Sequence, residues 1–301
     1  ASTPLAPGLF STTTGWPSRV ERLSATRRAV MSMPLPRWRM RSAPIASTGT
    51  SAFARVVDGI KLKLPVFIAP VGNFLREIDD DTTDALFKRA WDAGVRFYDT
   101  APMYGHGLSE LRTGHALRWK KRDDFVIASK VGRVLHPAKR ETINFAPWVN
   151  AAPFKIEFDY SYDGTMRSFE DSLQRLGLER IDILFIHDID VFTRGAEQPE
   201  VFKQAMDGCY KALASLRDQK LVKAIGVGVN EWQVCHEALK QRDFDCFLLA
   251  GRYTLLEQDA IDEFLPLCEK RGAAVLVGGG FNSGILATGA KPRTAAAIAL
   301  P

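Results

Sequence analysis

The sequence that decides the fold is VRFYDTAPMYGHGL, at residues 95–108. Its first part indicates a short buried strand, which ends at Asp99 and opens into a loop that carries Tyr104. Two later apolar runs end in the same manner, because FVIASK stops at Lys130 and IDILFIH stops at His187. We therefore take these four ionisable residues, each at or just past the end of a strand, as candidates for one functional site.

Strand and helix patterns alternate along most of the chain. Apolar runs typical of buried strands begin at Pro65, Val95, Phe125, Ile181, Ala224, Cys246 and Ala273. Segments with helical spacing of apolar residues lie between them, at residues 82–93, 109–119, 164–176, 201–218, 233–241 and 261–270. Strands that are apolar on both faces and alternate with helices predict a parallel sheet covered by helices.

The number of strand–helix units favours a (β/α)8 barrel, an α/β fold. A doubly wound sheet is disfavoured because no G-x-G-x-x-G motif follows the first strand. In such a barrel the loops after the strands carry the chemistry, and the four ionisable candidates fall there. An Asp-Gly pair between two alternating runs predicts an N-terminal β-hairpin at residues 54–64. Because the sequence ends at Pro301, soon after the seventh strand, we expect the last repeat of the barrel to be missing.

The connection after the third strand, residues 136–162, is long and rich in proline and aromatic residues. Connections of this length in a compact domain usually have a function. We expect this one to form a lid or a wall of a pocket.

The positive charge is concentrated at the start of the sequence. Residues 1–50 contain seven Arg and one Glu, a balance of +6, which leaves −1 of the total of +5 for residues 51–301. The rest of the chain therefore gives no electrostatic case for nucleic acid binding. We expect no membrane partner either, because no apolar run approaches the ~20 residues of a membrane helix.

The first part of the chain lacks a sustained apolar period. We predict that residues 1–52 are a disordered or non-native basic extension, with an organellar targeting peptide as the alternative. Residues 53–301 are then expected to form the incomplete barrel.

The four cysteines are Cys209, Cys235, Cys246 and Cys268, and they lie in apolar patterns without a C-x-x-C pair. This arrangement predicts buried free thiols and no metal site. Free thiols fit a reducing compartment, which we expect to be the cytoplasm.

The four ionisable candidates suit proton transfer to or from a C=O/CH–OH pair. A tyrosine hydroxyl has a pKa of ~10, and we expect the ammonium of Lys130 to lower the pKa of Tyr104. Asp99 would keep the lysine charged, and His187 could hydrogen-bond the oxygen of a bound carbonyl. Such a set fits hydride transfer with a nicotinamide cofactor. Taken singly, each residue also has an ordinary structural explanation, such as a turn cap or a core histidine.

A family resemblance supports this interpretation. GVRFYDTAPMYGHGLSE, at residues 94–110, resembles the signature of the aldo-keto reductases. The similarity continues at residues 128–132, 159–188, 224–233, 245–258 and 278–289. Within the family these segments are most similar to the D-threo-aldose 1-dehydrogenase (L-fucose dehydrogenase) branch, with pyridoxal 4-dehydrogenase close by. The resemblance implies a barrel closed at its bottom by the hairpin and a nicotinamide cofactor bound without a Rossmann domain.

The resemblance also implies roles for individual residues. Its catalytic tetrad falls on Asp99, Tyr104, Lys130 and His187. Asn230 matches the residue that holds the nicotinamide carboxamide, and an Asn offers both a donor and an acceptor. The loop that cradles the pyrophosphate would comprise Gly280, Phe281, Asn282, Ser283, Gly284 and Leu286. Candidates for the substrate pocket are Asn73, Phe74, Met103, Trp148 and Trp232. A turn asparagine, a plain flexible loop and core packing are the respective structural alternatives.

The expected activity is NAD(P)-dependent interconversion of a CH–OH and a C=O group on a small polar substrate. The preferred substrate would be an aldose at C1, of the L-fucose or D-arabinose type. Alternatives are a pyridoxal-type dehydrogenase and a catalytically impaired, truncated relative. Both NADP and NAD stay open, because the family's eighth strand, which carries the residues that select between them, is not in the sequence.

Overall fold

The structure is a computed structural model that describes residues 66–68, 71–251, 253–280 and 282. The chain divides into two units, Ala1–Ala43 and Pro44–Pro301, and all described residues belong to the second. Several predictions lie outside the described residues, namely the extension at 1–52, the hairpin at 54–64 and the roles of Phe281, Ser283, Gly284 and Leu286.

Seven strands form one parallel sheet in the order β1-β2-β3-β6-β7-β8-β9. Their bounds are β1 Val66–Ile68, β2 Phe97–Asp99, β3 Val126–Val131, β6 Ile183–His187, β7 Ala224–Val229, β8 Cys246–Ala250 and β9 Ala274–Gly278. Each strand pairs in parallel with the next one along the chain, apart from an inserted hairpin, as the barrel prediction requires. The sheet is curled, and no pairing within the described residues joins β9 back to β1.

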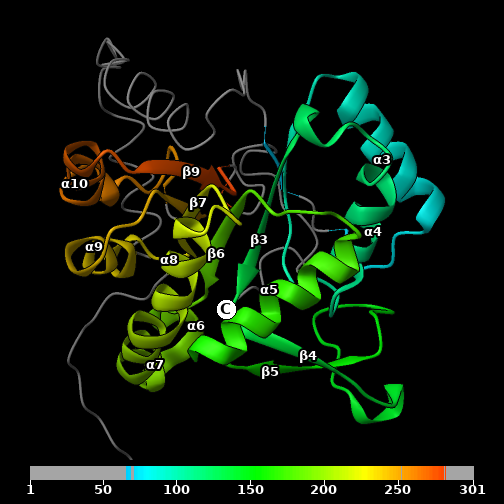
Figure 1. The fold of residues 1–301 in the computed structure, drawn as a ribbon, viewed down its shortest axis with the longest axis horizontal. Helices are drawn as coiled ribbons and strands as arrows, with labels where there is room; N and C mark the ends of the chain where they lie inside the picture. The colour runs from blue at the N-terminus through cyan, green and yellow to red at the C-terminus, as the bar shows by residue number, and fades with distance from the viewer. Residues whose placement is uncertain (1–65, 69–70, 252, 281, 283–301) are drawn as a thin grey trace, which may run out of the picture. The chain divides into compact units, whose positions relative to one another are not determined.

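Helices connect the strands at the predicted places (Figure 1). They are α3 Asp80–Asp92, α4 Leu108–Leu117, α5 Tyr162–Leu176, α6 Val191–Arg194, α7 Gln198–Gln204, α8 Tyr210–Asp218, α9 Trp232–Gln241 and α10 Phe264–Arg271. The helix predicted at 201–218 is interrupted by a π-helical turn, Ala205–Cys209. Gly208 in this turn packs so closely on Tyr160 that a Cβ would overlap the carbonyl oxygen of that residue. None of the described helices is both long and apolar enough to cross a membrane.

Strands β2, β3, β6 and β7 are buried on both faces, as their apolar sequences predict, whereas Val277 of β9 is exposed. One face of the strands from β2 onward contributes to a cluster inside the curled sheet, which includes Phe97, Val126, Ala128, Ile183 and Phe185. The other face packs against the helices, with Tyr98, Ile127, Leu184 and Ile186 among the buried residues. All four cysteines are buried and free, as predicted.

The long connection after β3 contains a hairpin that the sequence did not predict. β4 (Arg133–Pro137) pairs antiparallel with β5 (Phe154–Phe158). The segment between these strands returns to the connection between β1 and α3, where Trp148 forms an isolated bridge with Phe74. The connection therefore contributes a wall to the cavity described below, in agreement with one of the two expectations for it.

The crossing of α4 and α5, which lie side by side in Figure 1, depends on Gly114. A Cβ on this residue would overlap the carbonyl oxygen of Leu176. Because main chain cannot yield as a side chain does, we expect Gly114→Ala to lower the free energy of unfolding by about 1–3 kcal/mol. Urea denaturation measures the change. Gly280→Ala is the control, because nothing lies within 4 Å of the added Cβ there; equal stability of the two variants would contradict the account.

Candidate active site

The alternation of side chains along the strands brings three of the candidates together. Residues two apart on a strand point to the same face, so Asp99 follows Phe97, Lys130 follows Ala128 and His187 follows Phe185 on the inner face of the sheet. β2, β3 and β6 are consecutive in the sheet. The three ionisable side chains therefore occupy adjacent positions at the carboxyl ends of neighbouring strands.

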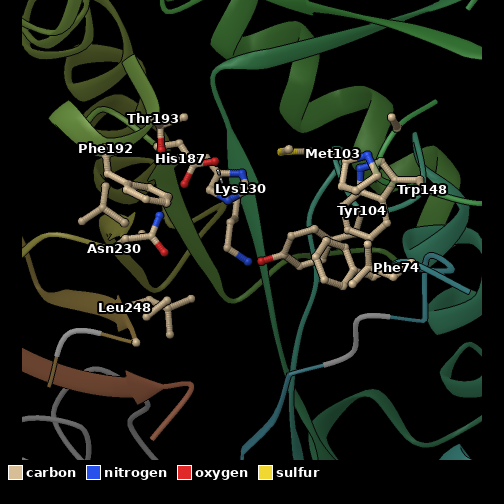
Figure 2. Close-up of a pocket in the computed structure, with 18 of the residues that line it drawn as sticks. Phe74, Met103, Tyr104, Lys130, Trp148, His187, Phe192, Thr193, Asn230 and Leu248 are labelled. Atoms are coloured by element: carbon tan, nitrogen blue, oxygen red, sulfur yellow. Dashed lines mark ion pairs between the residues drawn. The ribbon is translucent and has the colours of Figure 1, made fainter. Parts of the chain in front are cut away.

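Lys130 lies at the centre of this group. Its ammonium donates to Asp99 Oδ2 at 2.6 Å and to the carbonyl oxygen of Thr100 at 2.9 Å. It also hydrogen-bonds the hydroxyl of Tyr104, toward which it points in Figure 2. The side chains of Lys130 and Asp99 are 1% and 0% exposed. Burial lowers the pKa of Lys130, but the attraction of Asp99 and Tyr104 outweighs it, so the pKa of the lysine is raised.

The pKa of Tyr104 differs from the expectation. Burial raises it above 10.0, and the neighbouring Lys130 opposes this rise without reversing it. The carboxylates of Asp99 and Asp188 add to the increase. In this state Tyr104 is a protonated hydroxyl, able to donate a proton, and Lys130 is the group that favours the phenolate left behind.

His187 faces Tyr104 across the site. The two ring centroids are 5.9 Å apart in an edge-to-face arrangement. Burial, together with the positive charges of Arg133 and Lys130, lowers the pKa of His187 well below 6.5. Its Nε2 lies 3.4 Å from Asp188 Oδ2, and since a carboxylate only accepts, this contact favours the neutral tautomer with hydrogen on Nε2.

The lowered pKa of His187 predicts a pH dependence of stability. The unfolded chain binds a proton on this side chain below pH ~6.5, whereas the folded chain does not, so the free energy of unfolding falls as the pH falls. Between pH ~7.5 and ~5.5 we expect about 1.4 kcal/mol more loss in the wild type than in His187→Gln. Denaturation curves at both pH values measure the difference. His106, whose pKa is also lowered by burial, contributes equally to both proteins; identical losses in the two proteins would rule out a neutral His187.

Tyr104, Lys130 and His187 line a cavity of about 910 Å³. Its wall contains eight of the candidates from the sequence, which are Phe74, Met103, Tyr104, Lys130, Trp148, His187, Asn230 and Asn282. The rings of Phe74 and Tyr104 lie 5.3 and 5.7 Å from that of Trp148 and form one aromatic side of the cavity. In Figure 2 Asn230, Phe192 and Thr193 lie on the opposite side, with Lys130 between.

Two pocket candidates do not line this cavity. Asn73 is buried, and its Oδ1 accepts hydrogen bonds from the backbone N–H of Ile78 at 3.1 Å and from Arg112 Nη1 at 2.8 Å. Trp232 begins α9 and packs beside His236, with 6.1 Å between the ring centroids. Asn73 therefore belongs to the local packing, whereas Trp232 lines a second cavity together with Glu257. Asp99 is not in the wall either, but it lies directly behind Lys130.

Other wall residues were not identified from the sequence. They are Leu75, Ala146, Pro147, Asp188, Phe192, Thr193, Gly228, Val229, Leu248, Ala250, Gly251 and Glu257. For Asp188 a signal was present, because it directly follows a strand that ends in a candidate, and Phe192 and Thr193 lie on α6, the next helix along the chain. Gly228 lies beside Lys130, where a Cβ would be 3.6 Å from the lysine Cε.

The described residues fit the nicotinamide end of a cofactor. The backbone N–H of Asn230 donates to Asp190 Oδ2 at 2.7 Å. This hydrogen bond fixes the backbone of Asn230, a residue that lines the cavity. Gly279 and Asn282 have φ values of 66° and 50° around the exposed Gly280. Turns with left-handed residues suit an anion such as a phosphate, although the N–H of Asn282 donates to the carbonyl oxygen of Gly279 at 2.9 Å here.

Comparisons with known proteins agree with this site. A model of the Aldo/keto reductase family matches residues 70–296. The chain is 46% identical over 230 residues to pyridoxal 4-dehydrogenase of Microbacterium luteolum, covering 73% of this chain and 67% of that protein. It is 39% identical over 223 residues to D-threo-aldose 1-dehydrogenase of Pseudomonas sp, covering 73% and 65%.

A solved structure extends the match to the fold. The glycerol dehydrogenase of Gluconobacter oxydans aligns with a TM-score of 0.57 at 24% identity, covering 79% of this chain and 66% of that chain. The chain spans about two thirds of the length of the two curated relatives named above. The matches show that the chain belongs to the aldo/keto reductase family, whose members use NAD(P)(H) as cofactor.

Proposed function

We propose that the site interconverts a CH–OH and a C=O group on a small polar substrate with NAD or NADP, and that its preferred reaction is the oxidation of an aldose at C1. The observation that carries the proposal is the position of the Lys130 ammonium. It lies between a buried carboxylate, 2.6 Å away on Asp99, and the hydroxyl of Tyr104 in the cavity wall.

Each residue of the site has a separate role in this proposal. The reacting oxygen lies between the hydroxyl of Tyr104 and the Nε2 of His187, which orients it. Tyr104 donates a proton to this oxygen during reduction, and its phenolate, which Lys130 stabilises, accepts one from the substrate hydroxyl during oxidation. The nicotinamide supplies or removes the hydride when bound, and Asn230 would hold its carboxamide. Asp99 keeps Lys130 charged and aimed at Tyr104.

The relatives support two substrate classes. The similarity to D-threo-aldose 1-dehydrogenase supports an aldose, and Asp188, Thr193 and Asn230 provide polar groups in the cavity for its hydroxyls. Pyridoxal is the second candidate. It is favoured by the similarity to pyridoxal 4-dehydrogenase and by the aromatic side formed by Phe74, Tyr104 and Trp148, which suits a flat ring.

Steady-state kinetics with the full chain test the proposal. NAD⁺ and NADP⁺ are each supplied with L-fucose, D-arabinose or pyridoxal, and formation of the reduced cofactor is followed by absorbance. We expect kcat/KM for at least one sugar to exceed that for pyridoxal by about tenfold or more. A preference for pyridoxal would select the second candidate. No turnover of any of the three substrates, together with no saturable binding of either cofactor, would overturn both.

A further inference from the structure

Asp188 has an unusual backbone conformation that turns it away from the path of β6. Its φ is +49°, in the left-handed region that residues other than glycine seldom adopt. Three hydrogen bonds hold this turn. The N–H of Asp188 donates to the carbonyl oxygen of Gly228 at 3.0 Å, and the hydroxyl of Tyr160 donates to the carbonyl oxygens of His187 and Asp188 at 2.8 and 3.2 Å. The turn places Asp188 in the wall of the cavity.

The carboxylate of Asp188 is held through one of its two oxygens. Arg133 Nη2 donates to Oδ2 at 2.6 Å, and its positive charge favours the ionised carboxylate. Burial, together with the charge of Asp190, outweighs this attraction and leaves the pKa of Asp188 above its usual value. Its Oδ1 has no hydrogen-bond partner in the described part of the chain, although the side chain is only 13% exposed. One strong acceptor is therefore left for a molecule in the cavity.

Arg133 is not explained by stability alone. Its side chain is 2% exposed, and its Nε and Nη1 have no partner among the described residues. Taking a guanidinium out of water and pairing it through a single nitrogen is unfavourable or neutral compared with apolar packing. We explain the pair by its effect on Asp188, because the charge of Arg133 favours the ionised form of this carboxylate in the cavity wall.

We infer that Asp188 determines substrate specificity by accepting a hydrogen bond from a hydroxyl on the carbon next to the reacting carbon. The inference rests on the proposed function, because His187 Nε2 is assigned to the reacting oxygen. Asp188 Oδ2 lies 3.4 Å from this nitrogen. A hydroxyl on the carbon next to the reacting carbon would therefore lie within about one hydrogen-bond length of the same carboxylate, whose Oδ1 is the acceptor left for it.

The substrate class that fits is an aldose or another 2-hydroxy aldehyde in its open or hemiacetal form. A carboxylate only accepts hydrogen bonds, so it discriminates against an analogue with hydrogen in place of that hydroxyl. A site built to bond a hydroxyl loses the whole interaction when the hydroxyl is absent. Simple aldehydes are therefore expected to be poor substrates.

A matched pair of sugars tests the inference. D-arabinose and 2-deoxy-D-ribose differ only in the C2 hydroxyl, and glycolaldehyde and acetaldehyde form a second pair for the reduction direction. We expect the wild type to favour the hydroxylated member by at least about tenfold in kcat/KM, and Asp188→Asn to bring this ratio toward one. Asp218→Asn, an exposed change at the end of α8, is the control and keeps the wild-type ratio.

The outcomes separate this inference from the proposed function. If the wild type oxidises or reduces none of the four compounds, the proposed function fails. If it does so but Asp188→Asn keeps the wild-type ratio, or the wild type does not discriminate, Asp188 does not bind the hydroxyl. Thermal unfolding reports whether Asp188→Asn is folded. Should it not fold, the double variant Arg133→Gln/Asp188→Asn removes both charges, and the same ratio is measured there with the same criteria.

Discussion

Tyr104→Phe is expected to lower kcat/KM for the oxidation of L-fucose or D-arabinose by about 100- to 10,000-fold, the usual contribution of general acid–base catalysis. The variant loses the hydroxyl that Lys130 contacts, but it keeps a ring that can pack against Trp148, 5.7 Å away in the wild type. Binding of NADH or NADPH should therefore stay within about twofold of wild type, because the cofactor is assigned to other residues. Kinetics and a fluorescence titration measure the two quantities.

The control for this change is Tyr162→Phe, which removes a hydroxyl from an exposed residue at the start of α5. It should leave both quantities at wild-type values. A Tyr104→Phe protein that retains a third or more of the wild-type kcat/KM would remove Tyr104 from the proton transfer.

Lys130→Met is expected to affect stability and catalysis together. It leaves Asp99 buried without its 2.6 Å partner, and breaking a buried ion pair in this way typically costs 3–5 kcal/mol. It also removes the cation that opposes the rise in the pKa of Tyr104, so the phenolate becomes harder to form. We expect kcat/KM to fall by at least about 100-fold, and the free energy of unfolding to fall as stated.

A second variant separates the two effects. Asp99→Asn/Lys130→Met removes both charges, and it should recover much of the lost stability without recovering turnover. Lys211→Met, an exposed change on α8, controls for the substitution itself. If the double variant regains wild-type kcat/KM, Lys130 acts only through stability and the proposed mechanism is wrong.

Much of the fold follows from patterns that are local in sequence. Apolar runs and helical spacing predicted the strands and most of the helices, because in a parallel sheet each strand is buried on both faces. The π-helical turn at Gly208, between α7 and α8, could not be predicted from such a pattern. The helix continues across Gly208, as its pattern predicts, but with a π-helical turn where the main chain of Tyr160 approaches it. No local pattern reports such a contact.

The convergence of Asp99, Lys130 and His187 was also predictable, because period-two alternation and consecutive strand order fix it. The direction of the pKa shift of Tyr104 was not, since it depends on how far burial outweighs one adjacent ammonium. Asn73 and Trp232 were assigned to the pocket from the resemblance, and in this structure neither lines the cavity beside Lys130.

Asp188 shows the limit of reasoning from single positions. It follows His187 directly, yet its place in the cavity depends on a left-handed φ and on Arg133, which is 55 residues earlier in the chain. The inserted hairpin was missed for a similar reason. Its strands pair only with each other and are partly exposed, so they lack the continuous apolar run of the sheet strands.

The most direct test of the central claim is a crystal structure of the chain with NADP or NAD and a sugar or its lactone. We expect the Tyr104 hydroxyl oxygen within about 3.2 Å of Lys130 Nζ, and the substrate oxygen within hydrogen-bonding distance of both Tyr104 and His187 Nε2. A substrate oxygen bonded to neither, or a Tyr104 hydroxyl turned away from Lys130, would contradict it.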